Sequence, residues 1–259
     1  MESQSNPHKR QKLGFENYSD SKVLSDITIR YGASGERTFE GHRLLLSAKS
    51  YWFKAAFTGQ FAESSAKEIT LKEDDPDALR AMLNYAYDEK SVPWPDDSLA
   101  GTTFDIHHIL DLYRVGDKYD FPSFRLQLIF RLMTALRRWF SRPSEPSIGY
   151  AAESEEFCEI IRKVYDIVGS EHQEDQDLVE TFLQAIDEHP SARILNNTGG
   201  KQGIIVKASR EVAEFGRDIF LHLMYIVGTE DHKDGTVSTT ELCTGIKVRG
   251  LLRDLLKNR

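Results

Sequence analysis

The pattern of apolar and polar positions changes its period along the chain, and short strands are expected only near the start. Residues 27–31 are rich in β-branched and aromatic side chains, which favours a strand. Residues 32–35 carry turn chemistry, and residues 38–42 can form the returning strand. Residues 67–71 predict a third short strand. The early part of the chain is therefore expected to build a small sheet.

Helical spacing of apolar residues appears between and after these strands. From Leu44 the apolar positions follow a helical period, and the helix is expected to end near Gly59. Asp75 can cap a further helix that has Pro76 at its first position. The apolar stripe of that helix consists of Leu79, Met82, Leu83 and Ala86.

Beyond a loop at residues 91–103, which contains prolines and a glycine, the pattern is helical to the end of the chain. Pro143 and Pro146 mark a linker within this region, and no internal repeat is evident. Apolar stripes predict helices at residues 106–113, 123–140, 157–168, 179–186, 212–226 and 251–256.

This order of elements predicts an α+β first domain followed by an all-helical C-terminal region. We expect a disordered tail at residues 1–17, the first domain with its terminal helices at 18–140, a linker at 141–152 and the helical region at 153–259. A basic run at residues 8–12 is either a solvated part of the tail or a nuclear-import patch.

Composition narrows the classes of partner and compartment. The formal net charge of −8 argues against a chain that tracks a nucleic-acid backbone. Cys158 and Cys243 lie far apart in no spaced motif, which excludes a disulfide framework and fits a reducing compartment. No apolar run approaches the roughly 20 residues of a membrane helix, and no secretory signal is visible. We expect a cytoplasmic or nuclear protein without a membrane or nucleic-acid partner.

Residues that could carry catalysis or bind metal do not assemble into a site. Residues 230–241 resemble an EF-hand calcium loop, but Glu230 and His232 are poor matches at ligand positions, which favours a polar turn. His107 and His108 are neighbours on a predicted helix, so their rings cannot chelate one metal together. The sequence therefore predicts a protein that is not an enzyme and has no metal or cofactor.

His42 follows a strand whose residue Phe39 can place its ring in the core. A buried imidazole needs hydrogen-bond partners, so a structural role at the strand-to-helix turn is favoured. A catalytic role would need a nucleophile or carboxylate at a recognisable spacing, and the sequence shows none.

Five segments of the first domain, in this order and spacing, resemble the BTB/POZ domain, a protein–protein interaction fold. The resemblance covers about residues 22–140 and implies a small sheet flanked by helices. Its segments are Ser25-Asp26-Ile27-Thr28-Ile29, residues 39–53, residues 61–76, Asn84-Tyr85-Ala86-Tyr87 and Gly116-Asp117-Lys118-Tyr119-Asp120.

The resemblance also implies roles for particular residues. Asp26 and Arg43 match positions that form a charged pocket in similar domains, although Asp26 could instead only cap local backbone. Phe61-Ala62-Glu63 matches the hydrophobic-x-Glu motif of family members that bind the cullin scaffold of a ubiquitin ligase. The alternative is that Phe61 packs into its own domain and Glu63 is solvated.

The expected function is that of an interaction adaptor, with the cullin scaffold and an unidentified client as candidate partners. The chain shows no kelch pattern and no zinc-finger spacing, and its layout resembles short fungal proteins in which helices follow a BTB domain. A self-associating scaffold or a nuclear or transcriptional regulator without ligase function is the alternative. Homodimerisation stays open, because the segment before Ser25 is short and polar.

Overall fold

The computed structural model describes residues 14–92, 103–141, 150–169, 176–188 and 203–230. The chain divides into two compact units, each treated by itself below. Unit 1 comprises residues 1–94 and 111–126, and unit 2 comprises residues 95–110 and 127–259. None of the described helices is long and apolar enough to span a membrane.

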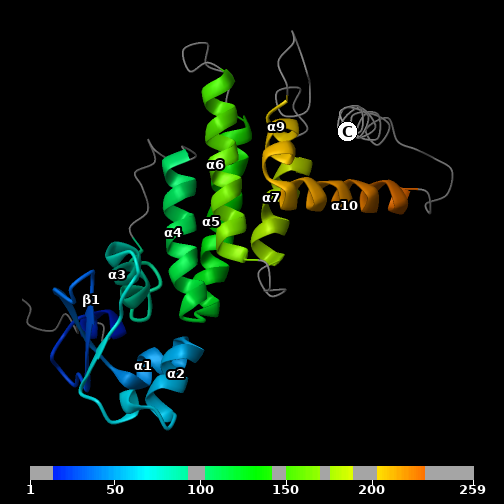
Figure 1. Cartoon of the computed structure of the whole chain (residues 1–259). Coiled ribbons are helices and arrows are strands. Elements are labelled where there is room, and N and C mark those ends of the chain that lie inside the picture. The colour runs from blue at the N-terminus through cyan, green and yellow to red at the C-terminus, as the bar shows by residue number, and fades with distance from the viewer. Residues whose placement is uncertain (1–13, 93–102, 142–149, 170–175, 189–202, 231–259) are drawn as a thin grey trace, which may run out of the picture. The chain divides into compact units, whose positions relative to one another are not determined.

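Unit 1 contains a three-stranded sheet in the order β2-β1-β3 (Figure 1). The strands are β1 (Ile27–Tyr31), β2 (Arg37–Gly41) and β3 (Glu68–Thr70). β1 pairs antiparallel with β2 and parallel with β3. All three strands lie within two residues of the predicted positions, because β-branched alternation and the glycines of the intervening turn mark them clearly.

One face of this sheet forms the core of unit 1. Ile29 in β1 lies opposite Phe39 in β2 and Ile69 in β3, and all three side chains are buried. Ile27 and Tyr31 point the same way, since successive strand residues alternate between faces. The Phe39 ring thus faces the core, where it lies 5.7 Å from the ring of Tyr87.

Short helices precede, connect and follow the strands. They are η1 (Phe15–Tyr18), α1 (Arg43–Lys49), α2 (Tyr51–Thr58), η2 (Ala62–Ser64) and α3 (Pro76–Tyr85). α3 begins as the sequence predicts, with the Asp75 carboxylate accepting hydrogen bonds from the backbone N–H groups of Asp77 and Ala78.

The single helix predicted from Leu44 to Gly59 is in fact two helices, α1 and α2, with a break at Ser50. Ser50 has extended backbone dihedrals, and its hydroxyl accepts a hydrogen bond from the N–H of Phe53, which caps α2. The same hydroxyl donates to the carbonyl of Tyr119 at 2.6 Å. The prediction was wrong because the apolar stripe continues across the break, while its cause is a contact with a distant segment.

The expected tail at residues 1–17 gives way to ordered structure earlier than predicted, because η1 lies largely within it. The segment after η1 is held by polar contacts rather than apolar packing. The Asp20 carboxylate accepts from the backbone N–H of Glu40 at 2.8 Å and from the Arg80 guanidinium at 2.8 Å. Ser19 donates to the Asn84 side chain at 3.0 Å. Hydrogen bonding of this kind leaves no hydrophobic period in the sequence.

Two long helices, α4 (Thr103–Lys118) and α5 (Pro122–Ser141), each contribute residues to both units. The remaining helices belong to unit 2. They are α6 (Tyr150–Val168), α7 (Gln176–Glu188), α9 (Ile204–Glu211) and α10 (Ala213–Glu230). α5 and α6 run alongside one another, and α10 crosses their direction (Figure 1). An α+β first part followed by helices is the predicted fold class, which the structure confirms.

Two helix boundaries of unit 2 differ from expectation. α6 begins at Tyr150, inside the segment 141–152 expected to be a linker. The sequence pattern also missed α9, because in a helix of only eight residues the consecutive β-branched residues Ile204, Ile205 and Val206 cannot be told from a strand. All three are buried, as is Ala208, whereas Arg210 and Glu211 are exposed.

Aromatic rings from three helices form the core of unit 2. Trp139 of α5 stacks on Phe157 of α6 with ring centroids 5.4 Å apart and an interplanar angle of 20°. Phe215 of α10 meets Phe157 edge-on at 6.2 Å. These rings are nearly fully buried, so unit 2 has an apolar core of its own.

Candidate functional site

The hydrophobic-x-Glu motif lies in the loop between α2 and β3, which we call the docking loop and define as residues 59–66. Phe61 flanks the short helix η2 on its N-terminal side, and its side chain is 64% exposed. Glu63, within η2, is also exposed. An aromatic ring and a carboxylate two residues apart thus both face solvent, which contradicts the alternative that Phe61 packs into its own domain.

The docking loop is closed by hydrogen bonds within itself. The carbonyl of Phe61 accepts from the backbone N–H of Ser64 at 3.1 Å and from the Ser64 hydroxyl at 2.7 Å. Gly59 permits the ring of Phe61 to approach the end of α2. A Cβ atom on Gly59 would lie 2.5 Å from the Ala55 carbonyl oxygen and 3.0 Å from a ring carbon of Phe61. The loop therefore has a defined shape that places the Phe61 ring at its edge.

Arg43, the first residue of α1, reaches across to the carbonyl side of the docking loop. Its guanidinium donates to the carbonyl oxygens of Glu63 and Ser64 at 3.2 Å, and also to that of Ala66. The guanidinium carbon lies 4.6 Å from the centre of the Phe57 ring in α2. Arg43 thus joins α1, α2 and the loop that carries Phe61.

Asp26 and Arg43 lie close together, but the contact uses the backbone of Arg43. The Asp26 carboxylate accepts a hydrogen bond from the Arg43 N–H at 2.8 Å and so satisfies a free donor at the start of α1. The Asp26 side chain is exposed, and the Arg43 guanidinium is directed to the docking loop. The local-capping alternative describes this geometry, while a charged-pocket role for the pair stays a prediction.

His42 is nearly buried between the N-terminal segment and α3. One ring nitrogen, Nε2, lies 2.8 Å from the carbonyl oxygen of Val23, and the other, Nδ1, lies 3.0 Å from the hydroxyl of Tyr87. Because a carbonyl only accepts, Nε2 carries the proton and Nδ1 accepts from Tyr87. The imidazole therefore joins the segment before β1 to the start of α1, which is a structural role.

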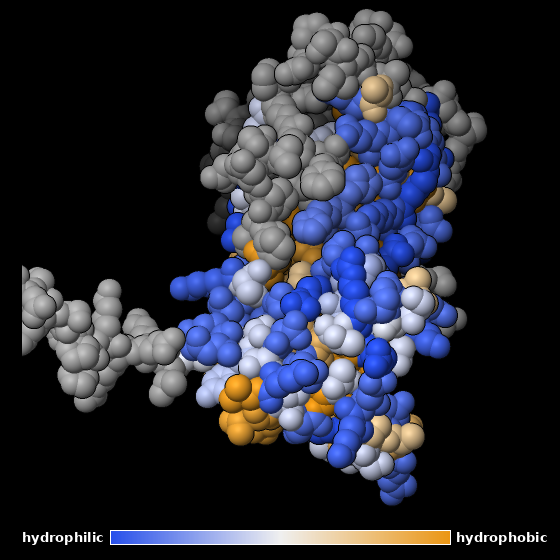
Figure 2. Space-filling model, turned by 90° about the vertical axis from the view of Figure 1, so that its left-hand side faces the viewer, coloured by the Kyte–Doolittle hydropathy of each residue, from blue (hydrophilic) through white to orange (hydrophobic). Residues whose placement is uncertain are grey.

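Several apolar side chains outside the docking loop are also exposed on unit 1. Figure 2 shows a mostly hydrophilic surface interrupted by hydrophobic patches. Leu24 is 78% exposed and has a positive φ of 61°, which is uncommon for a bulky residue. The large exposed apolar side chains of the segment before β1 and of α1 and α2 are Phe15, Val23, Leu24, Leu44 and Tyr51.

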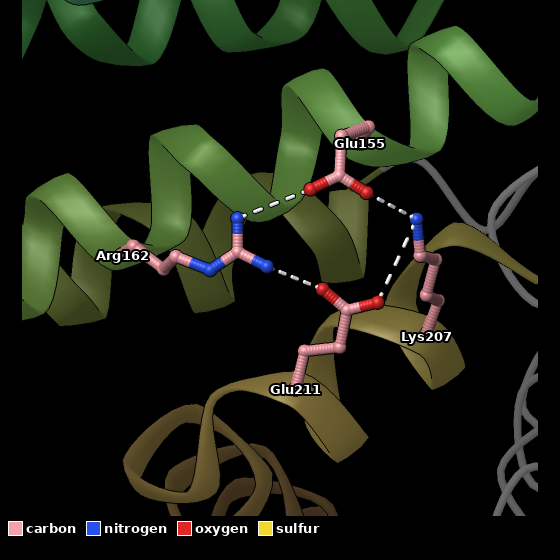
Figure 3. A network of polar contacts seen from close by, with 4 residues as sticks. All are labelled: Glu155, Arg162, Lys207 and Glu211. Atoms are coloured by element: carbon pink, nitrogen blue, oxygen red, sulfur yellow. Dashed lines mark hydrogen bonds and ion pairs between the residues drawn. The ribbon is translucent and has the colours of Figure 1, made fainter.

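The polar cluster of unit 2 is a closed ring of four charges, drawn in Figure 3. Glu155 and Arg162 lie on α6, while Lys207 and Glu211 lie on α9. Glu155 pairs with Arg162 at 3.2 Å and with Lys207 at 2.7 Å, and Glu211 pairs with Arg162 at 2.5 Å and with Lys207 at 3.6 Å. Every charge meets two opposite ones, so the ring clamps α6 to α9 and offers no unsatisfied group to a ligand.

No group of three or more metal-binding side chains occurs within the described parts of the chain. The EF-hand-like segment 230–241 lies outside them apart from its first residue. The basic run at residues 8–12 and the expected helix at residues 251–256 also lie outside. In the described residues, the docking loop therefore offers a candidate protein-binding site, with an exposed aromatic ring and an exposed carboxylate.

The role of Arg43 toward the docking loop was not predicted from sequence. Its three acceptors are backbone carbonyls, and a carbonyl is present at every residue whatever its side chain. A basic residue directly after His42 was the one available signal, and the resemblance assigned it to a different contact.

Comparison with known proteins identifies the first part of the chain. The family model described as "BTB/POZ domain" matches residues 15–125. Kelch-like protein 4 of Homo sapiens is 37% identical over 81 residues, which is 31% of this chain and 11% of that protein. The BTB/POZ and MATH domain-containing protein 5 of Arabidopsis thaliana is 31% identical over 115 residues, or 41% and 27% of the two chains.

A third relative, Trishanku of Dictyostelium discoideum, is 49% identical over 62 residues, which is 24% of this chain and 8% of that protein. The chain thus covers about a quarter or less of the length of these relatives. The aligned stretches of 62 to 115 residues are about the length of one domain or less, in agreement with a family match confined to residues 15–125.

Proposed function

Residues 15–125 form a BTB/POZ domain, and from this premise we propose that the protein is an interaction adaptor that docks on the cullin scaffold of a ubiquitin ligase. The docking loop would make the contact through Phe61 and Glu63. The observation that carries the proposal is the 64% exposure of Phe61 on a loop of defined shape. The proposal assigns no catalytic step to the chain.

The chemistry of the loop suits a protein partner. An exposed aromatic ring can fill an apolar pocket on the partner, and removal of such an anchor from the centre of an interface costs 2 kcal/mol or more, roughly. The Glu63 carboxylate adds charge complementarity, which governs orientation and association rate more than affinity. Because a fold does not define a function, this motif and not the domain alone supports the choice of cullin.

The helical unit 2 would either extend the contact with the scaffold or hold a client protein. It has its own aromatic core and its own clamp between α6 and α9, both of which support an independent packing unit. These relatives align with only 31% and 41% of this chain, so they do not identify a client, and binding experiments must find it.

The test is binding of the full chain to a purified cullin amino-terminal region, measured by calorimetry. We expect the wild-type chain to bind and the double variant Phe61→Ala/Glu63→Lys to lose most of the affinity. The matched control is Phe15→Ala/Glu16→Lys, which makes the same two changes on η1, where Phe15 is 62% exposed. The control should bind as the wild type does.

Two results would contradict the proposal in different ways. Tight binding by both double variants would remove Phe61 and Glu63 as the contact. Absence of binding by the wild-type chain would exclude the cullin as a partner and leave only a general adaptor role.

Self-association is a second candidate function, and a specific observation favours it. Leu44 at the start of α1 is 81% exposed, and Leu24 combines high exposure with an unusual backbone conformation. Exposed apolar side chains of this kind are candidate contacts of a protein interface. Light scattering would show a mass of twice 29.6 kDa for the wild type and of one chain for Leu44→Asp. A wild-type mass of one chain would exclude a stable homodimer.

A further inference from the structure

Arg43 lies behind the docking loop, not on its exposed edge. Its guanidinium meets the carbonyl oxygens of Glu63, Ser64 and Ala66, which are the carbonyls at the end of η2 and just beyond it. Carbonyls at the C-terminal end of a helix lack intrahelical partners, and a cation is the favourable group to place there. The residue thus satisfies acceptors that would otherwise depend on water.

The Arg43 guanidinium also lies over an aromatic ring. Phe57 of α2 is nearly buried, and its ring centre lies 4.6 Å from the guanidinium carbon. The backbone of Arg43 is in turn held by the Asp26 carboxylate at 2.8 Å. Arg43 is therefore anchored at its main chain, stacked on α2 and hydrogen-bonded to the loop.

We propose that Arg43 is a positioning residue that holds the docking loop in the shape that presents Phe61 and Glu63 to a partner. Arg43 contributes no contact to that partner through its guanidinium in this arrangement, since the group faces its own loop. A loop that is ordered before binding loses less conformational freedom on association, so its affinity is higher. The docking part of this inference rests on the proposed function, whereas the ordering of the loop does not.

The planar fork of arginine is essential to this role. One guanidinium reaches three carbonyls and also lies over the Phe57 ring, whereas a lysine ammonium is a point charge without that planar fork. Arg43→Lys should therefore recover only part of the effect of Arg43→Ala. Phe57→Leu keeps an apolar side chain and removes the stacking partner, so it should loosen the loop while leaving Arg43 in place.

The first measurement needs no partner and uses the full chain. Amide hydrogen exchange is followed by mass spectrometry in peptides that cover residues 59–66. We expect faster exchange in Arg43→Ala than in the wild type, an intermediate rate in Arg43→Lys, and unchanged exchange in β1 and α3. The matched control is Lys49→Ala, which removes a positive charge from the other end of α1, where it pairs with Glu89 at 2.9 Å.

The second measurement is the affinity for the cullin amino-terminal region. We expect Arg43→Ala to weaken binding about tenfold, since each ordered side chain or loop contact is worth on the order of one power of ten. Phe61→Ala/Glu63→Lys should weaken it further, and Lys49→Ala should leave it unchanged.

The outcomes separate this inference from the proposed function. Exchange in Arg43→Ala equal to the wild type would overturn the positioning role, whatever the cullin does. Faster exchange with unchanged cullin affinity would overturn its link to docking. If the wild-type chain does not bind the cullin, the proposed function fails and the exchange result alone decides the role of Arg43. If Arg43→Ala does not fold, Arg43→Lys and Phe57→Leu decide it by the same exchange measurement.

Discussion

The hydroxyl of Tyr87 serves both the backbone and the ring of His42. It lies 2.9 Å from the backbone nitrogen, whose N–H it accepts, and 3.0 Å from Nδ1, to which it donates. Burial raises the pKa of Tyr87, so the phenol keeps its proton and can play both parts at neutral pH. These two hydrogen bonds join the segment just after α3 to the turn between β2 and α1.

Replacement of Tyr87 by Phe should therefore destabilise unit 1. The ring volume is preserved, but the N–H of His42 and its Nδ1 both lose a partner in a buried place. We expect a loss of about 1–3 kcal/mol in the free energy of unfolding, measured by urea denaturation. Tyr51→Phe is the control, because Tyr51 is exposed and its change should stay within about 0.5 kcal/mol. Equal stabilities of the two variants would contradict the role given to Tyr87.

The second prediction concerns Ser50, the residue that separates α1 from α2. Ser50→Ala removes the cap on the Phe53 N–H, worth about 1 kcal/mol, and the hydrogen bond to the Tyr119 carbonyl, worth about as much again. We expect a loss of about 2 kcal/mol in the free energy of unfolding. Ser47→Ala, within α1, should leave stability unchanged, since alanine is the better helix former. A similar result for both serines would show that the break does not depend on this hydroxyl.

Ser50 also shows why some of the fold could be predicted and some could not. The three strands, α3 and its Asp75 cap are local features. They are encoded by the alternation of apolar and polar residues and by residues that are close to one another in sequence. The break between α1 and α2 depends on the carbonyl of Tyr119, about 70 residues away along the chain. A serine in an apolar stripe carries no sign of that distant acceptor.

In the candidate site, too, the features that are local in sequence were predicted and the long-range contacts were not. Phe61 and Glu63 were predicted because their side chains form a recognisable motif, and the structure places both at the surface. The hydrogen bonds from Arg43 to the docking loop were not predicted, because backbone carbonyls are their acceptors. α9 was missed for another reason, since it is only eight residues long and its run of three β-branched residues does not distinguish a helix from a strand.

The charge ring of unit 2 predicts a pH dependence with a defined sign. Hydrogen bonds from Lys207 and then Arg162 hold the pKa of Glu155 below its ordinary value of 4.5. A lowered pKa in the folded state means that the stabilisation is fully present above the ordinary value and is lost as the pH falls through the lowered one. Glu155→Gln should therefore flatten the acid limb of a plot of urea midpoint against pH.

Salt provides an independent check on this ring, because exposed ion pairs are screened by added ions. The difference between wild type and Glu155→Gln at neutral pH should shrink in high salt. Glu159→Gln, an exposed change on the same helix but outside the ring, should leave the acid limb as in the wild type. An unchanged acid limb in Glu155→Gln would mean that the ring does not contribute to stability in solution.

The last prediction concerns Cys158, which lies on α6 between Glu155 and Arg162 of the charge ring. Its side chain is fully buried, and burial, reinforced by the charge of Glu211, raises the pKa of the thiol to about 11. The reactive thiolate is then a much smaller fraction of the population at pH 7 than for an ordinary cysteine. In a Cys243→Ser variant, a thiol reagent should therefore label the folded chain very slowly and the urea-unfolded chain rapidly. The variant Cys158→Ser reports the rate of Cys243 separately. Labelling of folded Cys158 at the unfolded rate would show that α6 and α9 open readily and that the packing around this thiol is not maintained in solution.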